Sequence, residues 1–174
     1  VERSRGLGDV YKRQPVGCVI VKNDILLSSG RTSSSGRPHA EENAINSAKD
    51  KNNLSGSTMY VTLEPCAHKN LTGTSCAKLI AKSGISEIFI SCIDPDPRTA
   101  GKGITILKKN NIKVCQNYLQ DDCIDIYDGF FSRILNKKPF ISMKIACSLD
   151  GKIALNNNES KCCLLYTSPS PRDL

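Results

Sequence analysis

Short runs of β-branched residues alternate with helix-forming segments along most of this chain, and that alternation limits its fold more than any other feature. Val16–Val21 and Ile25–Ser28 are separated by a polar turn and predict a β-hairpin. The further strands are expected at Met59–Leu63, Glu87–Ser91 and Ile112–Cys115, and the helices at His39–Ala48, Cys76–Ser83, Ile104–Asn110 and Asp121–Leu135. This order predicts an α/β fold of three layers, α/β/α, with a mixed sheet.

Length and charge bound the class of protein. The 174 residues suffice for one domain and part of a second. The formal net charge is +7, from 24 Lys and Arg against 17 Asp and Glu. These basic residues are scattered without interleaved aromatic residues, which favours a solvated surface over a nucleic-acid path. No apolar run approaches the roughly 18 residues of a membrane span, and no charged-then-apolar leader opens the chain. We therefore expect a cytoplasmic protein with no nucleic-acid and no membrane partner.

Both ends of the chain look foreign to the rest. Ser4–Gln14 and Cys163–Leu174 continue neither a strand nor a helix pattern, and they resemble translated adapter sequence of the kind that DNA sequencing leaves behind. We interpret residues 1–14 and 162–174 as artificial extensions. The alternative is a pair of natural disordered termini.

Two fragments carry the chemistry, and both lie where a strand ends and a helix is expected to begin. One is His39-Ala40-Glu41, and the other is Pro65-Cys66 followed by Cys76. Without a secretory leader, the nine cysteines are expected to be reduced thiols rather than disulfides, and Cys18, Cys92 and Cys147 read as core residues. Catalytic zinc takes three N or S ligands and leaves a fourth position for water. His39, Cys66 and Cys76 therefore predict one zinc ion per chain.

Glu41 follows the expected ligand His39 by two residues, within the same first helical turn. A glutamate placed beside a metal-activated water can take its proton and return it to a leaving nitrogen. Zinc deaminases carry this arrangement in the signature H-x-E…P-C-x-x-C. The H-x-E and P-C parts match here, but nine residues separate Cys66 from Cys76 where the signature has two. The alternative is an acidic residue favoured by the helix dipole, which is our interpretation of Glu42.

Several motifs stand in order along Pro15–Lys161 and together resemble the bifunctional deaminase/reductase of riboflavin biosynthesis. They are residues 16–21 (VGCVIV), 36–41 (GRPHAE), 64–68 (EPCAH) with the wide spacing to Cys76, and 94–103 (DPDPRTAGKG). Residues 138–140 and 144–154 are similar to the opening strand and loop of the reductase half of that family.

The resemblance implies a cytidine-deaminase-like domain over residues 15–136. Its substrate would be a phosphoribosylated pyrimidine, 2,5-diamino-6-(5-phosphoribosylamino)pyrimidin-4-one, and its 2-amino group would leave as ammonia. Such an enzyme is a hydrolase acting on a cyclic amidine. Glu41 would protonate first the ring nitrogen and then the departing amine. The resemblance also implies substrate contacts from His68, Asp94 and Asp96.

Residues 137–161 would begin a reductase domain with a dihydrofolate-reductase-like fold that uses NADPH. The family would place Ala146 against that cofactor and Ser160 near the substrate. A nucleotide-binding domain typically needs well over about 100 residues, so we expect no reductase activity from this stretch.

Two other functions remain open from the residues alone. The first is a deaminase of the same fold that acts on cytidine or on a tRNA base, although the short C-x-x-C is absent. The second is a zinc-binding module without catalysis, which leaves Glu41 without a role.

The family usually has an Asn-Pro pair before Pro15, and Arg13-Gln14 stand there instead, so we expect zinc binding with weak deamination. A homo-oligomer is compatible with the resemblance.

Overall fold

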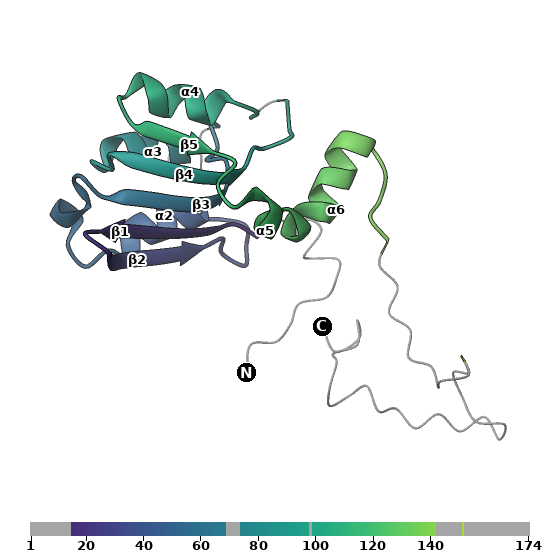
Figure 1. The fold of residues 1–174 in the computed structure, drawn as a ribbon, viewed down its shortest axis with the longest axis horizontal. Helices are drawn as coiled ribbons and strands as arrows, with labels where there is room; N and C mark the ends of the chain where they lie inside the picture. Colours follow the sequence, from purple (N-terminus) through teal and green to yellow (C-terminus); the bar gives the residue numbers. More distant parts are fainter. Residues whose placement is uncertain (1–14, 69–73, 98, 142–150, 152–174) are drawn as a thin grey trace.

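A five-stranded mixed sheet forms the centre of the protein (Figure 1). The structure, a computed structural model, describes residues 15–68, 74–97, 99–141 and 151. The strand order is β2-β1-β3-β4-β5, with β1 antiparallel to both neighbours and β3, β4 and β5 parallel. The strands are β1 (Gly17–Lys22), β2 (Ile25–Arg31), β3 (Thr58–Leu63), β4 (Glu87–Cys92) and β5 (Lys113–Gln116). The predicted α/β class and mixed sheet are confirmed.

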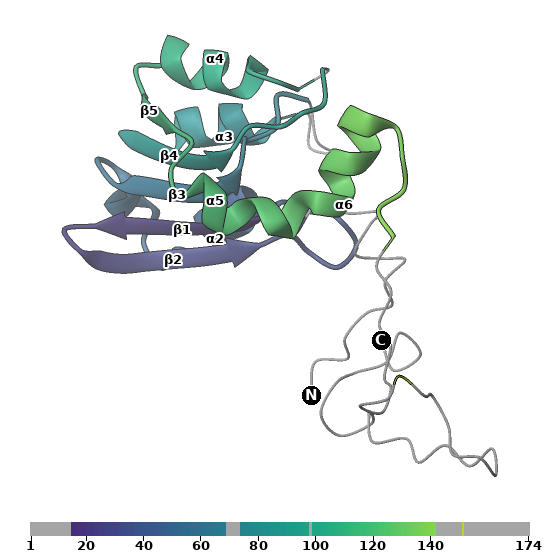
Figure 2. The ribbon, with the colours of Figure 1, turned by 45° about the vertical axis from the view of Figure 1, so that its right-hand side comes forward.

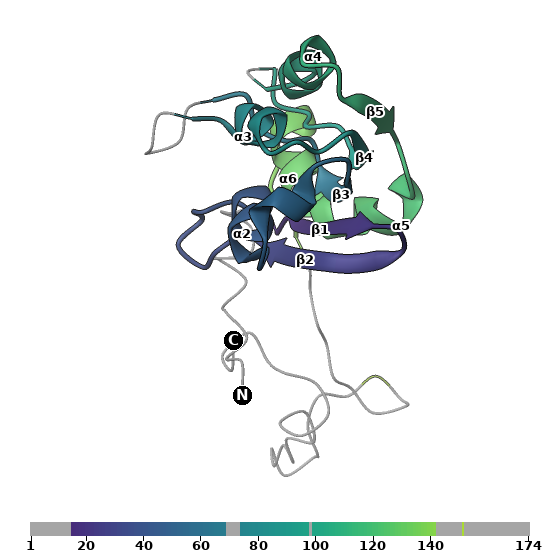
Figure 3. The same ribbon diagram turned by 90° about the vertical axis from the view of Figure 1, so that its left-hand side faces the viewer.

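Three helices cover one face of this sheet: α2 (Ala40–Ser47), α3 (Cys76–Lys82) and α4 (Lys102–Lys109) (Figure 3). A short 3-10 helix (Lys51–Leu54) precedes β3. Alternate strand residues point at the helices, as the period of two requires. The fully buried side chains of this core include Ile20, Met59, Ile80, Ile88, Ile90 and Leu107. The predicted core residues Cys18 and Cys92 are also buried, at 3% and 1% exposed.

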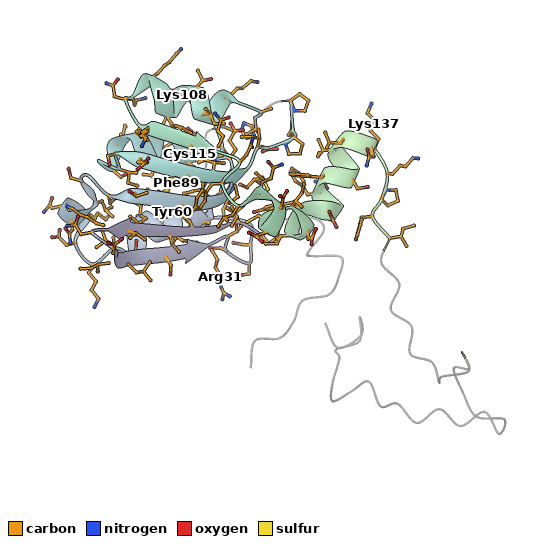
Figure 4. The ribbon with its side chains drawn as sticks, viewed as in Figure 1. Arg31, Tyr60, Phe89, Lys108, Cys115 and Lys137 are labelled. Atoms are coloured by element: carbon orange, nitrogen blue, oxygen red, sulfur yellow. The ribbon has the colours of Figure 1, made fainter. Side chains whose placement is uncertain are left out.

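Aromatic residues occupy the opposite face of the sheet. Tyr60 and Phe89 are partners across the parallel pair β3 and β4, and their rings stack at 4.9 Å between centroids. Figure 4 shows them side by side on that face. Tyr118 adds an edge-on contact to Phe89, also at 4.9 Å. The short helix α5 (Gln120–Ile124) lies on this side of the sheet (Figure 3).

The structure corrects the expected single helix over Asp121–Leu135. The chain forms α5, a 3-10 turn (Asp125–Tyr127), α6 (Asp128–Phe131) and a π-helical turn (Ser132–Asn136), one after another (Figure 2). Tyr127 anchors this segment to the sheet. Its side chain is fully buried beside Leu63 and Cys92, and its hydroxyl lies 2.6 Å from Thr62 Oγ1. Sequence periodicity does not register that contact, because it joins residues 65 positions apart.

No helix among the described residues is long and apolar enough to cross a membrane. Most of the expected reductase opening, residues 137–161, lies outside the described residues, and so do Ala146 and Ser160.

Three strand ends meet at one edge of the sheet. Because β2 and β3 are both antiparallel to β1, they run in the same direction, and β4 runs parallel to β3. The carboxyl ends of β2, β3 and β4 therefore lie at the same edge, where open α/β sheets build their sites. The chain leads from these ends to the starts of α2, α3 and α4.

Gly30 in β2 fixes how closely α2 approaches the sheet. A Cβ atom there would overlap the carbonyl oxygen of Ala40 and the amide nitrogen of Ala44, which are backbone atoms of α2. We expect Gly30→Ala to lower the free energy of unfolding by about 1–3 kcal/mol, because the helix must move away. Gly17→Ala is the matched control, since a Cβ there meets only Thr62 Cγ2 at 3.8 Å. Equal urea-unfolding midpoints for the two variants would contradict this packing argument.

Candidate active site

His39 is held at the start of α2 by the segment that precedes the helix. It is the N-cap residue, and its backbone carbonyl accepts from the Asn43 amide at 2.9 Å. The Asn43 side chain reaches back and donates to the carbonyl oxygens of Arg31, at 2.8 Å, and Pro38, at 3.4 Å. The end of β2 and the first turn of α2 are thereby tied together. These hydrogen bonds fix the position of the His39 backbone, from which the imidazole side chain extends.

Cys66 and Cys76 come from the two sides of the connection between β3 and α3. Cys76 is the first residue of α3, whose N-cap Ser75 accepts from the Lys78 amide. The Cys66 carbonyl accepts from the amide of Ala77 at 3.2 Å, which holds the Cys66 turn against the start of the helix. The two sulfurs lie within 4.8 Å of each other although nine residues separate the cysteines in sequence.

His39, Cys66 and Cys76 converge on one point. One ligand atom from each lies within 4.8 Å of the others, and Cys76 Sγ is 3.4 Å from His39 Nδ1. Three nitrogen and sulfur donors at such separations suit the bond lengths of tetrahedral zinc, about 2.3 Å to sulfur and 2.0–2.1 Å to nitrogen. The residues present therefore fit a zinc ion with one coordination position left for water.

The two thiols have opposite pKa shifts. Hydrogen bonding from Cys76, with a further contribution from His39, lowers the pKa of Cys66 to about 4. The same hydrogen bond to Cys66, together with burial, raises the pKa of Cys76. His39 has a raised pKa, first because of its hydrogen bond with Cys66. The cluster thus already stabilises one thiolate, which is the form of cysteine that binds metal.

Glu41 lies beside this cluster and away from water. It is 3% exposed, and burial raises its pKa to about 7 although His39 opposes the shift. The carboxyl group is also within hydrogen-bonding reach of Cys76. A carboxyl group that titrates near neutrality can both accept and return a proton, as a general acid and base must.

His68, Asp94 and Asp96 lie on two loops that meet at this edge. His68 Nε2 is 2.9 Å from the Thr99 hydroxyl, which joins the loop after β3 to the loop after β4. Asp94 and Asp96 are 6% and 8% exposed, and Asp94 accepts from the Asp96 amide at 2.9 Å. Burial raises the pKa of Asp94. The three residues expected to contact the substrate therefore lie on two loops that a hydrogen bond joins. Their roles in substrate binding remain predictions.

Sequence reasoning missed several residues of this region. Asn43, Thr99 and the buried carboxylate of Glu64 connect the segments that carry the expected ligands. Arg37 was also missed. Its positive charge opposes the rise in the pKa of His39. The Nη1 atom of Arg37 is buried without a hydrogen-bond partner among the described residues. Only Glu64 gave a local signal, as an acidic residue at the end of an apolar strand.

Several known proteins resemble this chain over two thirds or more of its length. The family described as the cytidine and deoxycytidylate deaminase zinc-binding region matches residues 3–92. The diaminohydroxyphosphoribosylamino-pyrimidine deaminase of Buchnera aphidicola from Acyrthosiphon pisum is 46% identical over 119 residues, which are 68% of this chain and 79% of that protein. The riboflavin biosynthesis protein RibD of Escherichia coli is 36% identical over 97% of this chain and 44% of its own length.

Solved structures agree with this assignment. The Thermotoga maritima diaminohydroxyphosphoribosylaminopyrimidine deaminase/5-amino-6-(5-phosphoribosylamino)uracil reductase superposes with a TM-score of 0.80 at 37% identity, over 92% of this chain and 46% of that one. RibD of Acinetobacter baumannii superposes with a TM-score of 0.75 at 38% identity, over 88% and 43%. This chain spans about two fifths of the length of the RibD proteins it matches. It belongs to the zinc-binding cytidine and deoxycytidylate deaminase family, among the deaminases of riboflavin biosynthesis.

Proposed function

We propose that this protein is a cytoplasmic, zinc-dependent deaminase that converts 2,5-diamino-6-(5-phosphoribosylamino)pyrimidin-4-one to its uracil analogue and ammonia. The observation that carries the proposal is the buried carboxyl group of Glu41 beside the His39, Cys66 and Cys76 cluster. The names of the relatives, a pyrimidine deaminase and a deaminase/reductase, support this substrate over free cytidine.

Each residue of the site has a distinct task in this reaction. His39, Cys66 and Cys76 hold zinc, which when bound activates water as the nucleophile at the ring carbon. Glu41 accepts one proton from the attacking water and donates it to the ring nitrogen. It then accepts the remaining proton of the hydroxyl group added to the ring carbon and donates it to the amine, which leaves as ammonia. Burial of Glu41 keeps bulk water from competing for these protons. Asp94 and Asp96 meet the ribose hydroxyls, and His68 contacts the substrate.

The longer relatives combine two activities, and this chain corresponds to the deaminase part of them. We propose that residues 15–136 form the deaminase domain and residues 137–161 the start of a reductase domain. NADPH, with Ala146 beside it and Ser160 near the substrate, belongs to the complete reductase and not to the deaminase site.

Ammonia release from the diaminopyrimidine ribotide tests this function directly. The purified chain is incubated with the ribotide, cytidine, deoxycytidine monophosphate and a tRNA anticodon stem in parallel. Turnover of the ribotide alone supports the proposal. Turnover of a cytosine or tRNA substrate in its place would assign a different deaminase, and zinc binding without turnover of any of them would assign a non-catalytic zinc module.

A further inference from the structure

Glu64 is a buried carboxylate that the deamination chemistry does not use. It follows β3 directly, is 4% exposed, and points its side chain at the start of α4. Its Oε2 atom accepts from the Gly101 amide at 3.0 Å. Its Oε1 atom accepts from the amides of Gly103, at 3.1 Å, and Ile104, at 3.4 Å. These amides lack partners inside the helix, because the first turn of any helix has none.

The backbone around Glu64 is tied to the same loop from its other end. The Glu64 amide donates to the carbonyl of Cys92, the last residue of β4, at 2.9 Å. At the far end of the loop, Gly103 packs so tightly that a Cβ atom would overlap the Pro65 carbonyl oxygen and lie 3.2 Å from Glu64 Oε1. One residue therefore fixes both ends of the segment between β4 and α4.

The segments joined in this way carry the two halves of the site. The segment 64–68 holds the expected zinc ligand Cys66 and also His68, and the segment 94–103 holds Asp94, Asp96 and Thr99. The His68–Thr99 hydrogen bond is a second connection between them, at 2.9 Å. Hydrogen bonds to a charged group contribute more than neutral ones, so the Glu64 carboxylate is the stronger of the two connections.

Glu64 also determines what the start of α4 can bind. The positive end of a helix is a ready site for a phosphate group. Here the protein's own carboxylate occupies it, with the charge buried and paired to three amides. The phosphate of a ribotide must therefore be recognised by other groups of the protein.

We infer that Glu64 is a positioning residue, which holds the substrate-binding loop 94–103 in register with the zinc-ligand loop 64–68. This inference rests on the proposed function, because it takes the loop 94–103 to bind the ribose. Glu64 touches neither the zinc ligand atoms nor the reacting carbon in this role. Its loss should weaken substrate binding while the chemistry at Glu41 continues.

Glu64→Gln tests the inference, because the amide keeps one acceptor oxygen and loses the other and the charge. We expect KM for the ribotide to rise at least about tenfold, the effect of losing a charge-assisted hydrogen bond, with kcat within about threefold and zinc content unchanged. Hydrogen exchange gives a readout besides activity. At least one of the amides of Gly101 and Gly103 should exchange about tenfold faster.

Glu87→Gln is the matched control, since it makes the same chemical change at the start of β4, where Glu87 pairs with Lys113 at the sheet edge. If Glu64→Gln does not fold, Glu64→Asp keeps the charge, shortens the reach by one methylene and should raise KM in the same direction. Exchange or KM values equal to those of the Glu87→Gln control would overturn the inference. An inactive parent chain would instead refute the proposed function, while the exchange data still report whether Glu64 holds the loop.

Discussion

Glu41→Gln is expected to reduce ammonia release from the ribotide by about a thousandfold while the chain keeps its zinc, because general acid–base groups typically contribute 10²–10⁴ in rate. Glutamine matches glutamate in shape but cannot carry the proton between water, ring nitrogen and leaving amine. The side chain is 3% exposed, so no water can take its place easily. An assay of released ammonia measures the loss of turnover, and elemental analysis measures whether zinc is retained.

Stability separates a catalytic role for Glu41 from a structural one. Burial raises the pKa of this carboxyl group from 4.5 to about 7, so its contribution to stability falls as the pH rises through that interval, and the cost of burying the carboxyl is fully present above it. The neutral glutamine should therefore leave the melting temperature unchanged or raise it. Glu42→Gln is the control, since Glu42 lies in the same first turn of α2 and carries the same charge. Comparable activity in the two variants would show that Glu41 is not the general acid and base. It would then be an acidic residue favoured by the dipole of α2.

The order of strands and helices could be predicted from the sequence, because each element carries its own period of apolar residues. The bounds were less predictable where tertiary contacts decide them. The strand expected at Ile25–Ser28 continues to Arg31, since Gly17 of β1 pairs with Arg31 although Ser29, Gly30 and Arg31 show no apolar pattern. Helix α4 begins at Lys102, two residues before the expected start, where the carboxylate of Glu64 satisfies its first amides.

The expected zinc ligands could be named from residue type because few side chains bind zinc and each of these stands after a strand. Parallel strands bring such positions to one edge, so proximity follows from topology. The supporting residues could not be found in this way. Glu64 meets partners 37 to 40 positions away, and His68 meets Thr99 at 31 positions, so only the folded chain shows that they belong together.

Removal of zinc is expected to lower the stability of the folded protein and to abolish its deaminase activity. Without a cation, the pair of Cys66 and Cys76 holds one thiolate beside one thiol, and Cys76 is only 2% exposed. A metal held at a free concentration of 1,000 times its Kd stabilises the folded state by about 4 kcal/mol, which for a domain of this size is roughly 10–20 °C in Tm. Thermal unfolding before and after a chelator, and again after zinc is restored, measures this difference.

Two cysteine variants show whether that stabilisation comes from the proposed cluster. Cys66→Ala removes a ligand, and Cys115→Ala removes a cysteine of similar partial exposure on β5, outside the cluster. We expect the first variant to lose its zinc and to melt near the temperature of the chelated parent, and the second to keep both zinc and melting temperature. Cys66→Ala also removes the hydrogen bonds of Cys66 with Cys76 and His39, so the chelated parent is the reference that isolates the contribution of the metal. Coincident curves with equal zinc content would place the metal elsewhere and leave Glu41 with no water to act upon.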